Sequence, residues 1–245
     1  MMKRAVLSFS SILLCLVAVG ATQRDWVRER VAPRSREESA SGSVGGVLGA
    51  SRDDDDVREA IRNRLRRGEP GTYIGDILRE RDSSLARWPD RHGRPLRVWV
   101  QPTASVADFS ESYVDEVRAA FEDWDALELP VRFEFAEDSS HADIHVTWLD
   151  HFDQPISGRT KWARDDNWWI TDADIVLAVH HHQGEILDLD AMKAMALHEI
   201  GHLLGLDHTK DSGSIMAPKV RVRGLSPADI STARLLYTLP PGAVR

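Results

Sequence analysis

Three histidines and a glutamate in this chain stand at a spacing that could hold a metal ion and use it. The segment from His198 to His208 reads H-E-x-x-H-x-x-G-x-x-H. On a helix, His198 and His202 lie on one face about one turn apart, so both imidazoles can bind the same ion. Zinc with three protein ligands keeps a fourth position for water and lowers the pKa of that water to roughly 7. Glu199 is the candidate general base for its proton, so the spacing predicts hydrolysis of peptide bonds or similar amides.

A helix must present this pair, and the residues before it favour one. The stretch from Asp188 to Leu197 is rich in alanine, methionine and leucine, and its aspartates suit the positive end of a helix dipole. Apolar positions recur at the helical period, namely Met192, Met195, Ala196, Ile200 and Leu203. Gly205 can adopt the left-handed conformation that ends a helix, so His208 is expected to return to the metal from outside it.

Two alternatives to a catalytic centre stay open at this point. A helix can carry H-E-x-x-H by chance, although Gly205, His208 and Met216 stand in register with it. A structural zinc usually fills all four positions and favours cysteine, whereas the single cysteine, Cys15, lies in an apolar run near the N-terminus. The residues therefore favour a catalytic ion.

Together these residues resemble the metzincin zinc peptidases and, among them, the matrixins of the matrix-metalloproteinase type, in particular short bacterial members. Thr209 follows the third histidine, where adamalysins carry aspartate, and Met216-Ala217-Pro218 is similar to the matrixin M-x-P. The resemblance implies that Glu199 is the catalytic base and that Met216 is the Met-turn residue, which packs beneath the imidazoles without binding the ion. It also implies one catalytic zinc with three ligands, His198, His202 and His208.

The resemblance extends from about Pro89 to Leu239 and implies a fold. It includes a first helix at Tyr113–Trp124 and a final helix from Leu225 to Tyr237. We expect an α+β metzincin catalytic domain, with a twisted mixed five-stranded sheet, three helices and a Met-turn. Alternating residues place the strands at 96–101, 131–135, 141–148, 158–163 and 174–179. Matrixins bind substrate antiparallel to an edge strand, here 158–163, which implies a polypeptide partner in extended form.

Some matrixin features are altered in this chain. For the second, structural zinc of the family, His151 and Asp153 could match the first pair of ligands. The other two histidine positions appear as Trp162 and a residue near Ile170, so we expect that ion to be absent. No calcium-binding glycine loop and no cysteine switch is recognisable, so calcium has no motif to support it.

The specificity pocket also departs from the family pattern. Matrixins wall this pocket with P-x-Y after the Met-turn, whereas this chain has Pro218-Lys219-Val220. Pro218 and Val220 are the candidate pocket wall, and the substrate preference does not follow from them. A second motif, the run His180-His181-His182, is interpreted either as a metal site or as a solvated loop.

The chain divides into four parts. Residues 1–21 have a basic start, an apolar run and small residues, as in a secretory signal peptide, so we expect a secreted or periplasmic protein with no membrane attachment after cleavage. Residues 22–56 are expected to be a flexible acidic linker. Residues 57–89 are expected to be a short helical segment, either a propeptide or a docked subdomain, with apolar contacts at Tyr73, Ile74, Ile77, Leu78 and Leu85. Residues 90–240 form the catalytic domain.

Composition and net charge limit the classes of partner that the protein is expected to bind. The 245 residues are 42% hydrophobic and 29% charged, which is typical of a soluble globular protein. A net charge of −8 argues against nucleic acid as a partner, and we expect a monomer. The sequence thus predicts a secreted zinc-dependent endopeptidase. The alternatives are a zinc amidase acting on non-protein amides and a zinc-containing module that binds peptide without cutting it.

Overall fold

A computed structural model describes residues 65, 68–81, 83–91 and 93–243 of the chain. The predicted signal peptide, the predicted linker and nearly all of residues 57–67 lie outside these residues. In the part that the structure describes, no helix combines the length and the apolar character needed to cross a bilayer.

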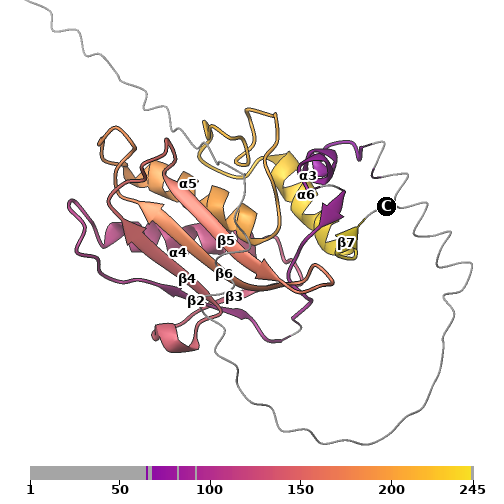
Figure 1. Cartoon of the computed structure of the whole chain (residues 1–245), viewed down its shortest axis with the longest axis horizontal. Helices are drawn as coiled ribbons and strands as arrows, with labels where there is room; N and C mark the ends of the chain where they lie inside the picture. Colours follow the sequence, from indigo (N-terminus) through magenta and orange to yellow (C-terminus); the bar gives the residue numbers. More distant parts are fainter. Residues whose placement is uncertain (1–64, 66–67, 82, 92, 244–245) are drawn as a thin grey trace, which may run out of the picture.

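Five strands form one mixed sheet in the order β3-β2-β4-β6-β5 (Figure 1). Their bounds are β2 Leu96–Val100, β3 Phe133–Phe135, β4 Ile144–Leu149, β5 Gly158–Arg164 and β6 Ile170–Ala178. The pairs β2–β3, β2–β4 and β4–β6 are parallel, and β5 lies antiparallel to β6 at one edge. Buried and partly exposed residues alternate along β4, because one face of the sheet packs against helices. The predicted mixed five-stranded sheet is therefore confirmed.

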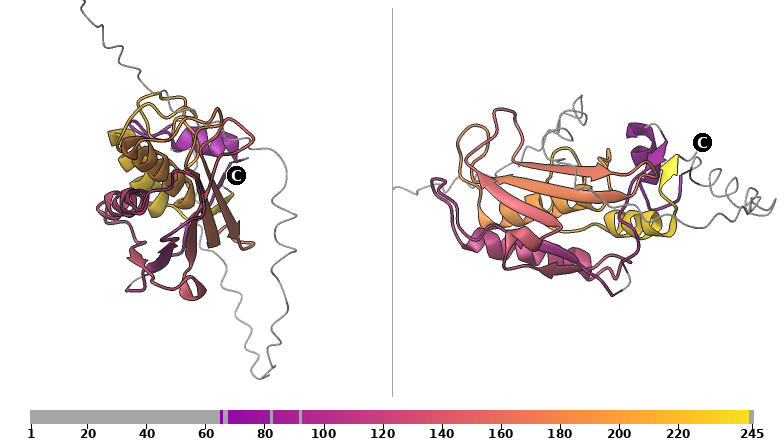
Figure 2. Two further views of the ribbon diagram at one scale, coloured as in Figure 1. Left: turned by 90° about the vertical axis from the view of Figure 1, so that its left-hand side faces the viewer. Right: turned by 60° about the horizontal axis from the view of Figure 1, so that its bottom comes forward.

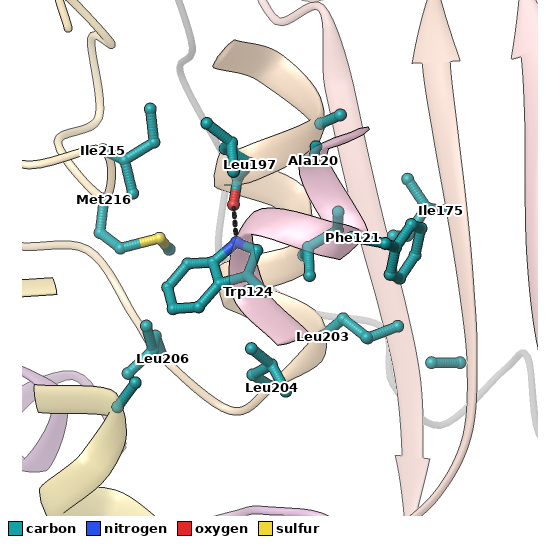
Figure 3. Packing of buried hydrophobic residues seen from close by; sticks show 14 of the residues in the cluster. Ala120, Phe121, Trp124, Ile175, Leu197, Leu203, Leu204, Leu206, Ile215 and Met216 are labelled. Carbon is teal, nitrogen blue, oxygen red and sulfur yellow. Dashed lines mark hydrogen bonds between the residues drawn. The ribbon is translucent and has the colours of Figure 1, made fainter. Parts of the chain in front are cut away.

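Two long helices cover that face of the sheet, as Figures 1 and 2 show. They are α4, Ser112–Asp125, and α5, Leu189–Leu203, which carries the first two histidines. The indole of Trp124 lies between them and donates a hydrogen bond of 3.0 Å from Nε1 to the carbonyl oxygen of Leu197 (Figure 3). This hydrogen bond joins the two helices side by side on the sheet, where α4 contacts β2 and β3 and α5 contacts β5 and β6.

A third helix, α6, Pro227–Thr238, lies at the end of the molecule. Its first turn has a capping box: the Ser226 hydroxyl accepts from the backbone of Asp229, and the Asp229 carboxylate accepts from the backbone of Ser226. Pro227 occupies the first helical position, where its missing N–H needs no partner.

The described residues include a fourth α-helix, α3, which spans Ile74–Glu80. It lies in the segment 57–89 that the sequence predicts to be helical, whereas the described part of residues 90–240 contains the three α-helices α4, α5 and α6. Seven residues are too few to form a stable helix alone, so α3 depends on its packing. α3 lies beside α6, and β1, Ser84–Leu85, pairs antiparallel with β7, Gly242–Ala243 (Figure 1). The apolar contacts predicted for this segment are all buried: Tyr73, Ile74, Ile77, Leu78 and Leu85.

Candidate metal centre

The three predicted zinc ligands point their Nε2 atoms at one another. His198 and His202 project from α5 with their Nε2 atoms 3.1 Å apart. The Nε2 atom of His208, from the following loop, lies 3.2 Å from that of His202 and 3.3 Å from that of His198. Zinc binds imidazole nitrogen at about 2.0–2.1 Å, so tetrahedral ligands stand about 3.3 Å apart. The spacing of the three nitrogens fits such an ion, and no other group of described residues is arranged to hold a metal.

The hydrogen bonds of the Nδ1 atoms show which ring nitrogen carries the proton in His198 and His202. Nδ1 of His198 lies 2.7 Å from the carbonyl oxygen of Ile215, and Nδ1 of His202 lies 3.2 Å from that of Leu206. A carbonyl oxygen only accepts, so each Nδ1 must donate and each Nε2 keeps a free lone pair. Burial lowers the pKa of His198 to about 4, and it lowers the pKa of His202 well below its ordinary value. Neutral imidazoles with free Nε2 atoms are the form that binds a metal.

The turn after α5 brings the third histidine back to the first two. Gly205 has φ of +101°, in the left-handed region, as the sequence predicts. A Cβ at this position would come within 2.1 Å of the Ala86 carbonyl oxygen, so a side chain has no room there. The Leu206 N–H donates to the Gly201 carbonyl oxygen at 2.9 Å and closes the turn. The loop that carries His208 is therefore packed on the N-terminal segment.

Met216, the predicted Met-turn residue, packs against the helix that carries the first two histidines. A Cβ on Gly201 would lie 2.3 Å from the sulfur of Met216, so the methionine packs against α5 between the two histidine positions. The buried Asp229 carboxylate accepts from the Ile215 N–H at 3.0 Å and from the Ser214 hydroxyl. The carbonyl that orients His198 is thus fixed through α6.

Glu199, which directly follows His198 on α5, is fully buried. Its Oε2 accepts a hydrogen bond of 2.7 Å from the Thr160 hydroxyl, while its Oε1 has no hydrogen-bond partner among the described residues. Burial raises the pKa of Glu199 to about 7, against the opposing effects of the Thr160 hydrogen bond and the Arg159 charge. A Cβ on Gly158 would lie 2.5 Å from Oε1, so the edge strand β5 packs directly on this carboxyl. One carboxyl oxygen is held by a hydrogen bond, and the other is buried without one.

The remaining candidate residues lie apart from this group. Each histidine of the 180–182 run has its own partner: His180 bonds Asp108 and Asp150, His181 bonds the Ser157 hydroxyl, and His182 bonds the Phe152 carbonyl oxygen. These partners argue against a metal site, and of the solvated loop only part is found, because His182 is exposed whereas His180 is buried.

Two of the altered family positions pack into the apolar core, because Ile170 is buried and Trp162 packs against its surface. Of the candidate pocket wall, Val220 is buried and Pro218 is exposed. A cavity of about 510 Å³ lies elsewhere on the sheet, between residues such as His145, Lys161 and Asp174, and none of the three candidate ligands lines it.

Several residues that support the site were not singled out from the sequence. Thr160 is 39 residues from Glu199, and no local pattern links the two. Arg81 contacts the loop before His208 from a segment more than 120 residues earlier. Asp229 did carry a signal, because it stands three residues after the capping Ser226, but that pattern predicts only a helix start.

Similarity to known proteins identifies the family of this chain. The family model described as Matrixin, a peptidase family, matches residues 100–238, which is more than half of the chain. The chain belongs to the matrixin family. This confirms the resemblance drawn from the H-E-x-x-H-x-x-G-x-x-H segment, and with it the α+β fold.

The matrixin is also similar to several metalloendoproteinases. It is 29% identical over 177 residues to metalloendoproteinase 2-MMP of Arabidopsis thaliana, over 63% of this chain and 44% of the relative. It is 32% identical over 97 residues to metalloendoproteinase 1 of Glycine max, over 38% and 30% of the two chains. It is 29% identical over 157 residues to matrix metalloproteinase-15 of Homo sapiens, over 61% and 21%. The matched part spans less than half of each of these relatives.

Proposed function

We propose that this matrixin is a zinc-dependent endopeptidase in which His198, His202 and His208 hold the ion and Glu199 is the general base. One observation carries the proposal: three Nε2 atoms converge at 3.1–3.3 Å, and the residue after the first histidine is a buried glutamate with one oxygen outside any hydrogen bond. When bound, zinc would acidify a water molecule and polarise the carbonyl of the scissile bond.

The buried carboxyl has the properties that a general base needs here. Thr160 holds Oε2, so Oε1 is the atom of Glu199 that accepts the proton of the attacking water. The same oxygen then delivers that proton to the nitrogen of the leaving amine, which balances the hydrolysis. Gly158 keeps Oε1 in place because the strand packs against it without a side chain.

The edge of the sheet supports a polypeptide substrate. β5 pairs with β6 along one side only and lies at the end of the strand order, so its other edge can pair with an added strand. An extended peptide on β5 would pass Gly158, which contacts the candidate base. We further propose that Pro218 and Val220 wall the specificity pocket. We also propose that this chain has the activity that the relatives' names state, that of a metalloendoproteinase.

The proposal also includes the compartment of the protein and the roles of the segments of the chain. We propose that residues 1–21 direct the protein to the periplasm or outside the cell, that residues 22–56 form a linker, and that residues 90–240 form the catalytic domain. The protein is expected to act as a monomer on polypeptides, with no role for nucleic acid; no sequence motif supports a calcium site.

The decisive experiment compares Glu199→Ala with the unchanged protein for zinc content and for cleavage of casein and of a peptide library. We expect one zinc per chain in both and loss of cleavage in the variant alone, because the ligands remain and the base is gone. Cleavage of non-protein amides without any peptide cleavage would point to an amidase. Peptide binding with no cleavage by the unchanged protein would point to a binding module, and full activity of Glu199→Ala would refute the assigned role.

A further inference from the structure

We infer that Arg81, in the segment before the catalytic domain, is a positioning residue that holds two of the three zinc ligands in place. The inference rests on the proposed function, because it assumes that the histidine triad binds zinc. It also assigns the segment from Gly68 to Arg91 to the metal site, instead of to a detachable propeptide.

The guanidinium of Arg81 binds three consecutive residues of the loop between the second and third histidines. Nε donates to Oδ2 of Asp207 at 2.9 Å, Nη1 donates to the Gly205 carbonyl oxygen at 2.8 Å, and Nη2 donates to the Leu206 carbonyl oxygen at 2.9 Å. The Trp162 ring from β5 faces the guanidinium carbon at 5.2 Å. All the hydrogen bonds from this side chain therefore go to the turn that returns the chain to the metal.

Two of these acceptors are themselves bonded to candidate ligands. Oδ1 of Asp207 accepts from the backbone N–H of His208 at 2.8 Å. The Leu206 carbonyl oxygen that accepts from Arg81 also faces Nδ1 of His202 at 3.2 Å. Arg81 thus reaches His208 through one carboxylate and His202 through one carbonyl. Such partners orient a ligand and set which ring nitrogen faces the ion.

Burial makes this contact specific for arginine. The side chains of Arg81 and Asp207 are only 11% and 10% exposed. A planar guanidinium can serve three acceptors in fixed directions, whereas a lysine ammonium is a point charge on a flexible stem. If the guanidinium is removed, the Asp207 carboxylate stays buried without its cation, and the turn is expected to rearrange toward solvent.

Neighbouring residues of the same segment hold the turn on both sides. The Thr209 hydroxyl donates to Oδ2 of Asp76 at 2.8 Å, directly after the third histidine. The Trp88 indole donates to the Leu203 carbonyl oxygen at 2.9 Å, at the end of the helix that carries the first two. Neither of these hydrogen bonds involves an Nε2 atom of the three histidines. The segment therefore supports the ligands without competing for the metal.

The same segment offers a matched control for the test. Arg87 is equally buried, with 8% of its side chain exposed, and it donates to the Leu239 and Trp88 carbonyl oxygens at 2.9 and 3.0 Å. It also pairs with Asp90 at 2.6 Å, and none of these partners contacts a candidate ligand. Arg87→Met and Arg81→Met therefore both remove a buried guanidinium, but only the second should disturb the metal.

The experiment measures zinc affinity by chelator competition, the visible spectrum of the cobalt-substituted protein and the thermal stability of the metal-free protein, all on the full chain. We expect Arg81→Met to weaken zinc binding by about 10- to 100-fold, as loss of a residue behind a ligand typically does. Its cobalt spectrum should change in the region that reports tetrahedral coordination. Arg87→Met should lower metal-free stability by a similar amount and leave zinc affinity within about twofold of the unchanged protein.

Asp207→Asn, alone and combined with Arg81→Met, shows whether Arg81 acts through the Asp207 carboxylate. If it does, the losses of zinc affinity in the two single variants do not add up in the double variant. Additive losses would overturn that route. If Arg81→Met does not fold, Arg81→Lys decides: zinc affinity equal to that of the unchanged protein refutes the inference, and a loss of tenfold or more supports it. His202→Ala separates the two proposals. If it still binds zinc, the proposed function fails; if it loses zinc while Arg81→Met retains full affinity, only the role of Arg81 fails.

Discussion

Gly158→Ala should separate the position of the candidate base from the binding of the metal. The added methyl carbon would lie 2.5 Å from Oε1 and 2.7 Å from Cγ of Glu199, and 2.8 Å from the sulfur of Met195. Ordinary contact begins at 3.4 Å, so the carboxyl or the strand must move by about 0.9 Å. Glu199 is fully buried and cannot swing into solvent to escape the methyl group.

The size of the effect follows from this displacement. A misplacement of about 1 Å in a catalytic group can reduce a rate by about 100-fold. This corresponds to about 2.7 kcal/mol in the activation barrier. The three atoms nearest to the methyl group belong to Glu199 and Met195 and to none of the histidines, so zinc content should stay at one per chain. Overpacking of this kind also lowers the free energy of unfolding by about 1–3 kcal/mol.

The assay is kcat/KM on a cleaved peptide, with zinc content and thermal unfolding measured on the same samples. Gly224→Ala is the matched control, because a Cβ there would meet no atom within 4 Å. We expect the control to keep full activity and Gly158→Ala to lose about 100-fold at unchanged zinc content. Full activity in Gly158→Ala would show that the strand does not set the position of Glu199. Loss of zinc would show that the strand acts on the metal itself.

Three further predictions concern the surroundings of the site. Asp229→Asn should lower the free energy of unfolding by about 2–3 kcal/mol and weaken zinc binding, because buried donors of the Met-turn lose a charged acceptor; unchanged denaturant unfolding would contradict this. His180→Gln should be more destabilising at pH 6 than at pH 9. Burial lowers the pKa of His180, but Asp108 and Asp150 outweigh it, and the raised pKa means that this stabilisation is lost as pH rises through it; equal effects at both pH values would refute the ion pairs. Deleting residues 22–91 should lower activity and zinc affinity, and a rise in activity would restore the propeptide interpretation.

Periodic patterns predicted the regular elements well. The strand expected at 96–101 is β2, and the final helix expected from Leu225 to Tyr237 is α6. β6, expected at 174–179, begins four residues earlier, at Ile170. Its pairing with β5 extends it through polar residues, which break the alternation of apolar and polar residues. Elements of two residues, such as β1 and β7, are held by each other and leave no periodic signal.

The candidate ligands could be predicted because their spacing is local. His198, Glu199 and His202 stand within one helix, and Gly205 marks the turn that returns His208. The residues that orient these side chains could not be predicted, because each lies far in the sequence from the part of the site that it contacts. The contact of Arg81 with Asp207 joins positions 126 residues apart and depends on how a seven-residue helix packs. A single sequence contains no pattern for such a pair.

The location of the metal is the most direct test of the account. The full chain should be crystallised with zinc and diffraction data collected on both sides of the zinc absorption edge. We expect a single anomalous peak about 2.0–2.1 Å from each Nε2 atom of His198, His202 and His208. A crystal with no peak at this position, or with the only peak at another group of residues, would contradict the central claim.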